Sequence, residues 1–489
     1  MASEYQTKLF INNEYADAKS ADTLSLTNPF DGSTIPAAVQ IAGAEDIALA
    51  VAAAQSAFKT GPWSTFTGAQ RAACMHKFAD LIVENAKELA DLDALCMGAP
   101  IASNAGFIIP EAAAVFRYYA GWADKIEGES FAADDGTYKI VRHEPLGVCA
   151  GIAPWNAPIL YVGWKIAPAV AAGNTFIFKA SEKSPLSALY LGKLVVEAGF
   201  PPGVIQFVSG AAQTGALLAS NMIISKISFT GSTFVGKIIQ KLALESNMKR
   251  VTLELGGKSP AIVFADADIP NAVGSAADGF LFNNGQVCVA GSRLLVQEDV
   301  APAFIEAVKG RFEAINSSLG NDPRVSTTHY GPMADEAHFK RVMSYIELGK
   351  QHAEPVVGGK QKGDKGYFIE PTLFVNPDKD GKVFNEEIFG PVLSVVTFKT
   401  EDEVIELAND TKTGLSATIY TSDLNRALRV SAKIESGNVS INAPHFPVHT
   451  VPFGGFKESG SGKELGKYGL REYLQTKTVL INMKLVPKL

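Results

Sequence analysis

Cysteine is scarce in this chain: its 489 residues include four, Cys74, Cys96, Cys149 and Cys288. They are far apart, no two have the Cys-x-x-Cys spacing, and no histidine stands near them at the spacing of metal ligands. This pattern argues against a zinc site and against a disulfide framework. We therefore expect no metal, and the low cysteine content is typical of a reducing compartment.

Strongly basic segments and long uninterrupted apolar runs are also missing. The net charge is −7, and no cluster of lysine and arginine is long enough for a nucleic-acid surface. The most apolar stretch, residues 146–173, is interrupted by three prolines, an asparagine and a lysine, which excludes a clean membrane span. We expect neither nucleic acid nor a membrane as a partner.

The ends of the chain carry no strong targeting signal. The N-terminus has no basic segment leading into an apolar run, so we expect no secretory signal and a cytoplasmic protein. The last residues, Pro487-Lys488-Leu489, resemble the peroxisomal Ser-Lys-Leu signal but lack its serine. A peroxisomal location stays open as the less favoured alternative.

The composition is that of an ordinary globular protein, with 47% apolar and 19% charged residues. The length predicts about two or three domains. The N-terminal region is predicted to be mainly helical. A hairpin with an Asn-Asn turn over residues 8–15 precedes helices over 43–58, 67–90 and 110–126.

From residue 148 to residue 254, short apolar strands alternate with helices. This alternation is the rhythm of a doubly wound parallel sheet. The predicted strands cover residues 175–179, 204–208 and 224–229, and the predicted helices cover 184–198, 211–219 and 232–244.

A second α/β rhythm begins after Gly256. The predicted fold class is therefore α/β, with two doubly wound α/β domains. The expected strands cover residues 261–264, 292–297, 367–374 and 392–398, and the expected helices cover 269–283, 300–315, 334–350, 401–410 and 424–434.

Two exposed strands are predicted far apart in the sequence. The first half of residues 138–152 and the whole of residues 476–483 alternate polar and apolar side chains. Two such strands could pair with each other and present an edge to a partner subunit. We expect a small β extension that serves oligomerisation.

The chemistry of the chain is predicted to centre on Cys288. This cysteine lies between Gly285 and Gly291, whose small size allows close approaches that side chains would block. Upstream, Glu254 is followed by a Gly-Gly turn. We hypothesise that Cys288 is a nucleophile and Glu254 its partner. The alternative for a lone cysteine is a small buried residue on a glycine-punctuated loop.

Three other stretches suggest ligand binding. Gly231-Ser-Thr-Phe-Val-Gly236 joins a strand to a helix, a place that favours phosphate, although its spacing is not Gly-x-Gly-x-x-Gly. Lys179 and Glu182 end another strand of the same sheet, where both could bind ribose hydroxyls. Asn156, between two prolines, could donate its N–H to a developing oxyanion. Taken alone, the first stretch is better explained as a plain strand-to-helix connection, and the second as a solvated pair at a helix start with Ser184 as cap. A structural turn explains the third equally well.

Two later stretches are harder to interpret. Glu386-Glu-Ile-Phe-Gly-Pro391 precedes a strand, so its carboxylate and aromatic ring could hold a sugar and a flat ring. A turn is the alternative. Residues 452–460 form a glycine-rich loop whose purpose first principles do not explain.

Together, these stretches resemble the aldehyde dehydrogenase superfamily from about residue 8 to about residue 483. No single motif is decisive, but all occur in the family's order. The matching motifs are Pro154-Trp-Asn-Ala-Pro158, Lys179-Ala-Ser-Glu182, Phe229-Thr-Gly-Ser-Thr-Phe-Val-Gly236, Leu253-Glu-Leu-Gly-Gly-Lys-Ser-Pro260, Asn284-Gly-Gln-Val-Cys288, Glu386-Glu-Ile-Phe-Gly-Pro391 and Pro452-Phe-Gly-Gly-Phe-Lys457.

The resemblance implies a mechanism. Cys288 would attack the aldehyde as thiolate, and the oxyanion would be held by the Asn156 side chain and the Cys288 backbone N–H. Hydride transfer to the nicotinamide would leave a thioester, which water activated by Glu254 would hydrolyse. Lys165 and Glu464 would form a proton route. Products would be a carboxylic acid and reduced cofactor, and Glu254 argues against the coenzyme-A-acylating branch.

The resemblance also implies the cofactor. Lys179 and Glu182 match residues that hold the adenosine ribose, and a carboxylate there would repel a 2′-phosphate, so NAD is favoured over NADP. Ser232 matches the pyrophosphate contact, and Glu387 and Phe389 match the nicotinamide-ribose contacts. The other expected cofactor-binding residues are Trp155, Gly231, Gly236 and Leu255.

The family organisation implies three parts for this chain. Residues 1–125 and 146–255 would form the NAD-binding domain, and residues 256–471 the catalytic domain. Residues 126–145 and 472–489 would supply the oligomerisation strands of a homodimer or homotetramer.

The substrate is suggested by Ala157, where many relatives have phenylalanine beside the substrate tunnel. Alanine should widen the tunnel, and the Asn-Ala-Pro and Lys-Ala-Ser-Glu variants resemble those of dehydrogenases for salicylaldehyde and vanillin. We therefore expect bulky or aromatic aldehydes as the small-molecule substrate. In the alternative, Tyr161 or Phe446 refills the space and small aliphatic aldehydes are preferred. The expected tunnel residues are Ala157, Tyr161, Trp164, Phe282, Phe446 and Phe453.

Two other functions are weighed against this one. A catalytically silent structural relative would have lost Cys288, Glu254 or Asn156, and all three are present. A thiol esterase that uses the same cysteine without cofactor would not need the ribose and pyrophosphate motifs.

Overall fold

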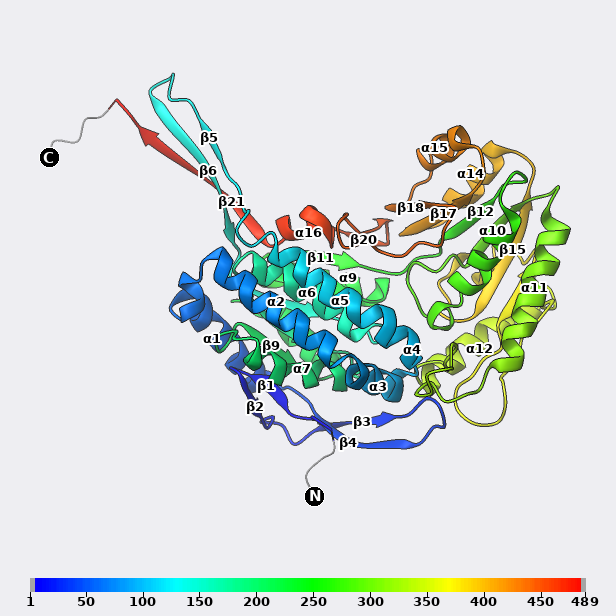
Figure 1. Cartoon of the computed structure of the whole chain (residues 1–489), viewed down its shortest axis with the longest axis horizontal. Helices are drawn as coiled ribbons and strands as arrows, with labels where there is room; N and C mark the ends of the chain where they lie inside the picture. The colour runs from blue at the N-terminus through cyan, green and yellow to red at the C-terminus, as the bar shows by residue number, and fades with distance from the viewer. Residues whose placement is uncertain (1–4, 485–489) are drawn as a thin grey trace.

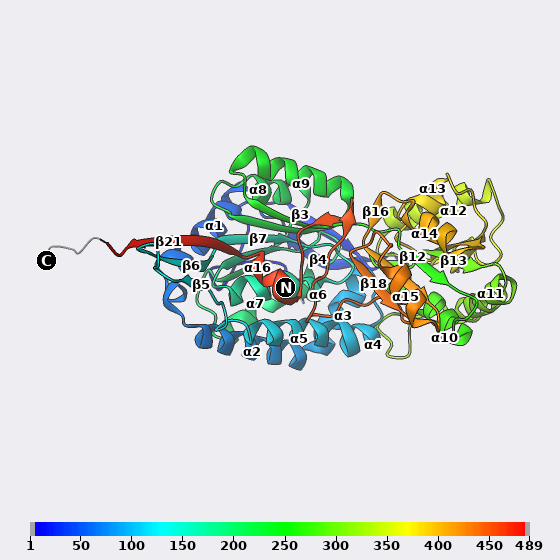
Figure 2. The same cartoon turned by 90° about the horizontal axis from the view of Figure 1, so that it is seen from above.

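A computed structural model describes residues 5–484. Two α/β bodies lie side by side, and a narrow β arm projects from the first of them (Figure 1). The first body holds the N-terminal half of the chain, and the second holds most of the C-terminal half. Figure 2 shows the arm leading away from both bodies.

The first body is built on an eight-stranded sheet with the order β2-β1-β9-β8-β7-β10-β11-β20. Its five central strands are parallel, and β7, β8, β9 and β10 are buried along their whole length. Burial on both faces explains their continuous apolar runs. The parallel strands are β7 (Val148–Ile152), β8 (Thr175–Lys179), β9 (Ile205–Val208), β10 (Lys226–Thr230) and β11 (Arg250–Glu254).

Helices connect these strands. Three of the four match the predicted helices, and the first, over residues 158–171, was not predicted. The connections α6 (Pro158–Ala171), α7 (Leu186–Glu197), α8 (Ala212–Ser220) and α9 (Thr233–Ser246) give the strand order of a doubly wound sheet. At one edge, β1 (Leu9–Ile11) and β2 (Glu14–Ala16) form the predicted hairpin. Both turn residues, Asn12 and Asn13, have positive φ, which asparagine tolerates.

The N-terminal helices cover one side of this sheet, but one of them was wrongly predicted as continuous. The segment 67–90 is divided into α2 (Gly68–Glu84) and α3 (Ala86–Met97). The break falls at Asn85, whose side chain donates to the Leu81 carbonyl and so competes with the helical backbone. Also present are α1 (Ala44–Lys59), α5 (Ile109–Ala120) and an unpredicted hairpin of β3 (Thr23–Thr27) and β4 (Thr34–Gln40).

The second body is built on a six-stranded parallel sheet with the order β14-β15-β13-β12-β17-β18. Two predictions were wrong here. The predicted strand 367–374 is shorter, and the predicted helix 269–283 ends early and passes into π and 3₁₀ turns. The strands are β12 (Pro260–Val263), β13 (Arg293–Gln297), β14 (Thr372–Val375), β15 (Val392–Phe398), β17 (Ser416–Tyr420) and β18 (Asn438–Ile441). The helices include α10 (Ile269–Gly274), α11 (Ala301–Ser318), α12 (Glu336–Lys350), α14 (Glu401–Asn409) and α15 (Leu424–Ser431).

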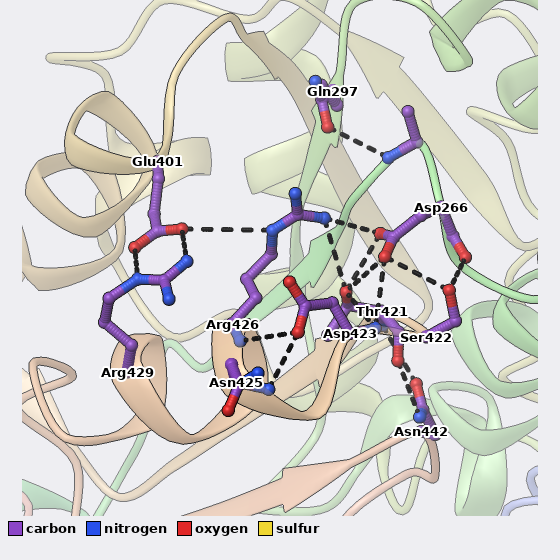
Figure 3. A network of polar contacts seen from close by, with 11 residues as sticks. Asp266, Gln297, Glu401, Thr421, Ser422, Asp423, Asn425, Arg426, Arg429 and Asn442 are labelled. Atoms are coloured by element: carbon purple, nitrogen blue, oxygen red, sulfur yellow. Dashed lines mark hydrogen bonds and ion pairs between the residues drawn. The ribbon is translucent and has the colours of Figure 1, made fainter.

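A polar network closes the carboxyl end of this second sheet (Figure 3). The order of strands reverses between β12 and β17, which is where doubly wound sheets usually bind ligands. There, the Asp266 carboxylate accepts hydrogen bonds from Thr421 Oγ1 at 2.9 Å and from Arg426 at 2.7 Å. Arg429 binds both oxygens of Glu401 beside it. These groups are already paired with one another, so this end of the sheet is closed by its own side chains.

The arm consists of the two exposed strands whose pairing was predicted although they are far apart in the sequence, and one short strand lies beside them. β6 (Thr137–Pro145) and β21 (Leu474–Asn482) are antiparallel from Leu474↔Pro145 to Asn482↔Thr137, and β5 (Glu129–Phe131) joins the other side of β6. The predicted pairing is confirmed. Within residues 5–484, no helix combines the length and apolar character that crossing a bilayer requires. The Pro487-Lys488-Leu489 ending lies outside the described residues.

Candidate active site

The two sheets face each other across the segment 255–259, which joins the carboxyl end of β11 to the amino end of β12. The carboxyl edge of the first sheet is therefore opposite the amino edge of the second. Glu254 is the last residue of β11, Cys288 lies in the loop before β13, and Glu387 lies in the loop before β15. The fold thus brings together residues that are far apart in the sequence.

The Cys288 loop is held in an irregular backbone. Asn283, Asn284 and Gly285 all have positive φ. At Gly285 a Cβ atom would lie 2.6 Å from the Gly390 carbonyl oxygen, so only glycine fits. The Gln286 side chain donates to the Pro332 carbonyl at 3.2 Å and accepts from the Ala334 N–H at 3.0 Å. These contacts fix the loop that presents Cys288.

Cys288 is the most accessible of the four cysteines, because Cys74, Cys96 and Cys149 are buried and Cys288 is partly exposed. Burial of the thiol raises the pKa of Cys288 to about 12, and the nearby carboxyls of Glu387 and Glu254 act in the same direction. The thiol form is therefore favoured. A reaction at this sulfur needs a group that takes its proton.

Glu254 is almost fully buried, and neither carboxylate oxygen has a hydrogen-bond partner among the described residues. Burial raises the pKa of Glu254 well above its ordinary value, with the Glu464 charge as the next cause. A Cβ atom at Gly454 would lie 2.8 Å from Glu254 Oε1, and one at Gly460 would lie 2.1 Å from the Leu253 carbonyl oxygen. The glycine-rich loop 452–460 therefore lies directly against this carboxyl.

Asn156 is attached to the Cys288 loop. Its side-chain N–H donates to the Gln286 carbonyl at 3.0 Å, and the Asn283 side chain donates to the Asn156 carbonyl at 3.3 Å. Asn156 Oδ1 is buried and has no partner among the described residues. The amide has a second N–H, so it can donate to an oxygen bound near Cys288.

A fully buried ion pair lies next to these groups. Lys165 Nζ is 2.7 Å from Glu464 Oε1, and the same ammonium donates to Ser228 Oγ at 2.9 Å and to Thr230 Oγ1 at 2.7 Å. Ser228 and Thr230 were missed from the sequence. Their alternation on the predicted strand β10, which places both on one face, was the available signal.

One cleft at the junction of the sheets has about 710 Å³ of empty space, part of it open to solvent. Ten of the predicted site residues line it, together with three residues that sequence reasoning missed, Thr230 of β10 and His338 and Arg341 of α12. The predicted residues in its lining are Trp155, Asn156, Tyr161, Gly231, Ser232, Glu254, Leu255, Cys288, Glu387 and Phe389.

The Glu387 and Phe389 segment is firmly placed in that cleft. Glu387 Oε1 accepts from the Gly257 N–H at 3.1 Å, and burial raises the pKa of Glu387 to about 7. Phe389 has φ 63, and its carbonyl accepts from His338 Nε2 at 2.7 Å. The Phe389 ring meets the Trp155 indole edge-on at 5.4 Å between centroids. Burial lowers the pKa of His338 to about 4, so its imidazole is neutral.

Three predicted cofactor residues lie outside this cleft. Among the described residues, Lys179, Glu182 and Gly236 do not line it. Lys179 Nζ is 3.4 Å from Glu182 Oε2; the lysine is buried and the Glu182 side chain is 46% exposed. Gly236 contacts Leu255, because a Cβ there would lie 2.6 Å from Leu255 Cδ2.

A second cavity, with about 790 Å³ of empty space partly open to solvent, reaches Cys288 from another side. It is lined by five of the six predicted tunnel residues, namely Ala157, Tyr161, Trp164, Phe282 and Phe446. The sixth, Phe453, is not in this lining and packs against the Trp164 ring at 5.0 Å. Phe107, which was not predicted, meets the Phe446 ring at 5.7 Å and the Phe282 ring at 6.2 Å.

Cys288, Asn156 and Tyr161 line both cavities. The cysteine therefore lies where a largely apolar tunnel meets a cleft rich in polar groups. Such a position suits a nucleophile that must reach a substrate from one side and a second ligand from the other.

Comparisons with known proteins agree with this arrangement. A family model described as "Aldehyde dehydrogenase family" matches residues 15–479. The chain is 46% identical to an aldehyde dehydrogenase of Alternaria alternata, over 98% of this chain and 96% of the relative. It is also 46% identical to retinal dehydrogenase 2 of Homo sapiens, over 98% and 92% of the two chains.

Solved structures give the same result. The aldehyde dehydrogenase KauB of Pseudomonas aeruginosa matches with a TM-score of 0.95 and 41% identity, over 98% of this chain and 97% of that chain. The indole-3-acetaldehyde dehydrogenase AldA of P. syringae, solved as a mutant in complex with NAD⁺ and IAA, matches with a TM-score of 0.94 and 40% identity over the same shares.

Proposed function

Because this chain belongs to the aldehyde dehydrogenase family, we propose that it oxidises bulky or aromatic aldehydes to carboxylic acids with NAD. The observation that carries the proposal is the position of Cys288 at the meeting point of the tunnel and the cleft. The aldehyde enters through the tunnel, and the cofactor binds in the cleft.

Cys288 is the nucleophile in this proposal. The Glu254 carboxylate takes the Sγ proton, Sγ bonds to the aldehyde carbon, and the electron pair of the C=O π bond moves to the oxygen, which becomes an oxyanion. The second N–H of Asn156 and the backbone N–H of Cys288 donate to that oxygen. The contacts of Asn156 with the Gln286 and Asn283 positions keep its amide in place for this task.

Glu254 acts on water in the second half of the reaction. Its oxygens have no partner among the described residues and lie in the same cleft as Cys288, and the raised pKa makes its carboxylate a stronger base once it is ionised. Loss of a hydride from the former aldehyde carbon to NAD would leave a thioester on Cys288. Glu254 takes a proton from the water that attacks this thioester, and the cysteine leaves as a thiolate as the acid forms. Lys165 and Glu464 lie next to Glu254 and carry the proton onward through a buried chain that includes Ser228.

The cleft fits a dinucleotide. It offers the Trp155 and Phe389 rings as flat surfaces, and Gly256 leaves no room for a Cβ atom beside Glu387. When bound, NAD supplies the hydride acceptor. Glu387 holds a ribose through its carboxylate, and Ser232 with the first N–H groups of α9 receives a phosphate.

NAD is favoured over NADP in this proposal. Lys179 and Glu182 lie beyond the cleft at the carboxyl end of β8, where they hold the outer ribose. The exposed Glu182 carboxylate disfavours a 2′-phosphate by charge repulsion. Residues 1–125 and 146–255 would form the cofactor domain and 256–471 the catalytic domain.

The arm is proposed to join subunits into a homodimer or homotetramer. β5 and β21 are the outer strands of the three-stranded arm, and Leu480 and Ile481 of β21 are exposed. The proposed location of the chain, the cytoplasm, is a separate assignment. Light scattering coupled to size-exclusion chromatography measures the molar mass of the wild type and of the double variant L480D/I481D. The variant should have the lower molar mass, and an unchanged molar mass would contradict a role of the arm in assembly.

The function itself is tested by following NADH absorbance. The protein should reduce NAD with benzaldehyde and its derivatives, more slowly with propanal, and more slowly with NADP than with NAD. Cys288→Ala should abolish the signal. Full activity of that variant would rule out the mechanism, whereas a preference for propanal would overturn only the substrate class.

A further inference from the structure

The tunnel that leads to Cys288 holds a single acidic side chain. Among the described residues that line it, Glu111 is the only acidic one, and neither lysine nor arginine is present. The rest of the wall is mainly aromatic and aliphatic, with a few uncharged polar groups. A carboxyl group in such a wall is costly unless it has a partner or a ligand.

Glu111 has a partner on one side only. His449 Nδ1 lies 2.7 Å from Glu111 Oε1, and because a carboxylate accepts, the imidazole donates. No described residue donates to Glu111 Oε2. The His449 ring rests against Tyr118 at 5.6 Å between centroids, which holds the imidazole on the loop side of the carboxylate.

The Glu111–His449 pair is partly open to solvent. The two side chains are 22% and 25% exposed. Glu111 belongs to the first turn of α5, and His449 belongs to a loop 338 residues later. Glu111 and Cys288 line the same tunnel, so an aldehyde bound to Cys288 can direct its opposite end toward Glu111.

We propose that Glu111 is a specificity-determining residue that selects aldehydes whose remote end carries a hydrogen-bond donor, above all a positively charged one. The free oxygen of the carboxylate accepts that donor, and the tunnel wall encloses the apolar body between the two ends. A substrate with a carboxylate at the remote end meets repulsion instead. This inference rests on the proposed function and narrows its substrate class.

The alternative explanation is that the Glu111–His449 hydrogen bond only stabilises the packing of the loop around His449 against α5. The two explanations differ in what each variant does. Glu111→Gln removes the negative charge and keeps the shape of the side chain, whereas Glu111→Asp keeps the charge. His449→Ala removes the hydrogen bond to the loop and leaves the Glu111 carboxylate in place.

The test uses para-substituted benzaldehydes of similar length as probes. They are 4-(dimethylaminomethyl)benzaldehyde as the cation with an N–H donor, 4-(hydroxymethyl)benzaldehyde as the neutral donor, 4-ethylbenzaldehyde as the apolar match and 4-carboxybenzaldehyde as the anion. The readout is kcat/KM with NAD for each probe. Thermal unfolding of every variant verifies that it folds.

The wild type should prefer the amine over the carboxylate by at least about tenfold, the factor that corresponds to 1.4 kcal/mol. E111Q should lower this ratio about tenfold and reduce the advantage of the hydroxymethyl probe over the ethyl probe. E111D should retain more of the ratio than E111Q, and H449A should not lower it.

If the ratio of kcat/KM for the amine probe to kcat/KM for the carboxylate probe is equal in wild type and E111Q, the assignment is overturned. The same follows if H449A lowers this ratio as much as E111Q does, because the pair would then act through the loop. A chain that reduces NAD with none of these aldehydes contradicts the proposed function and this inference with it. An active dehydrogenase with an unchanged ratio contradicts the role of Glu111 alone.

Discussion

Lys165 Nζ lies 2.7 Å from Glu464 Oε1, and both side chains are shielded from water. The pair joins α6 to the residues just before α16 (Gly466–Arg471), 299 positions later in the chain. The Glu464 charge also contributes to the raised pKa of Glu254. One buried ion pair therefore ties the C-terminal segment to the first body and affects the proposed base.

Replacing Glu464 with glutamine should destabilise the protein markedly. The Lys165 ammonium would stay buried without its counter-charge, and breaking such a pair costs roughly 3–5 kcal/mol. Urea unfolding followed by tryptophan fluorescence measures the loss. As a control, Lys8→Ala breaks the exposed pair with Asp17, which should cost about 1 kcal/mol or less. Similar losses for both variants would contradict the buried character of the Lys165 pair.

Glu254→Gln should change both catalysis and the dependence of stability on pH. Steady turnover should fall about 10²–10⁴-fold, the usual contribution of a general base. The pKa of Glu254 is higher in the folded protein than in the unfolded chain, so Glu254 ionises at lower pH in the unfolded chain. The free energy of unfolding therefore falls as pH rises from the ordinary pKa of 4.5 toward the folded pKa. Glutamine does not ionise, so E254Q should not show this fall.

The stability part of this prediction is measured by urea unfolding at two pH values. E254Q should gain stability relative to wild type at pH 8, and the gain should shrink at pH 5. A gain that is the same at both pH values would show that Glu254 ionises normally in the folded protein.

Glu387→Gln should make Cys288 react faster with iodoacetamide. After burial, the Glu387 carboxyl is the next cause of the raised pKa of Cys288, and glutamine removes its charge. The pKa of Glu387 is about 7, so the effect should appear above pH 7 and fade below it. Alkylation is followed by mass spectrometry of the Cys288 peptide.

Glu386→Gln is the matched control for that experiment. The neighbouring Glu386 carboxylate is engaged by the Tyr345 hydroxyl at 2.6 Å and is not among the causes of the Cys288 shift. Alkylation should therefore stay near the wild-type rate. Equal acceleration in both variants would point to a loosened loop and not to charge.

Ala157→Phe should narrow the tunnel and disfavour bulky substrates. Ala157 lines the tunnel together with Tyr161, Trp164 and Cys288, so a ring there would fill the space that the proposed aromatic substrate would occupy. The kcat/KM for benzaldehydes should fall at least about tenfold, more than the kcat/KM for propanal. Equal losses for both substrate types would remove Ala157 from the specificity argument.

Much of the fold was predictable because its signals are local. The alternation of apolar strands and helices between residues 148 and 254 reflects burial on both faces of a parallel sheet, and Asn12 and Asn13 tolerate the positive φ of their turn. Asn85 shows the limit of such reasoning. The helical pattern continues through it, and only its own hydrogen bond to Leu81 reveals the break.

Short motifs and periodicity were enough to identify the family, most of the strands and helices, and the residue types able to carry out the chemistry, because these patterns record local backbone needs. Tertiary structure decided which residues share a space. It brought His338 into the cleft with Trp155 and placed Glu111 beside His449, while it left Lys179 and Glu182 outside the cleft lining. Such contacts join segments hundreds of positions apart, and no local pattern of side chains or backbone encodes their meeting.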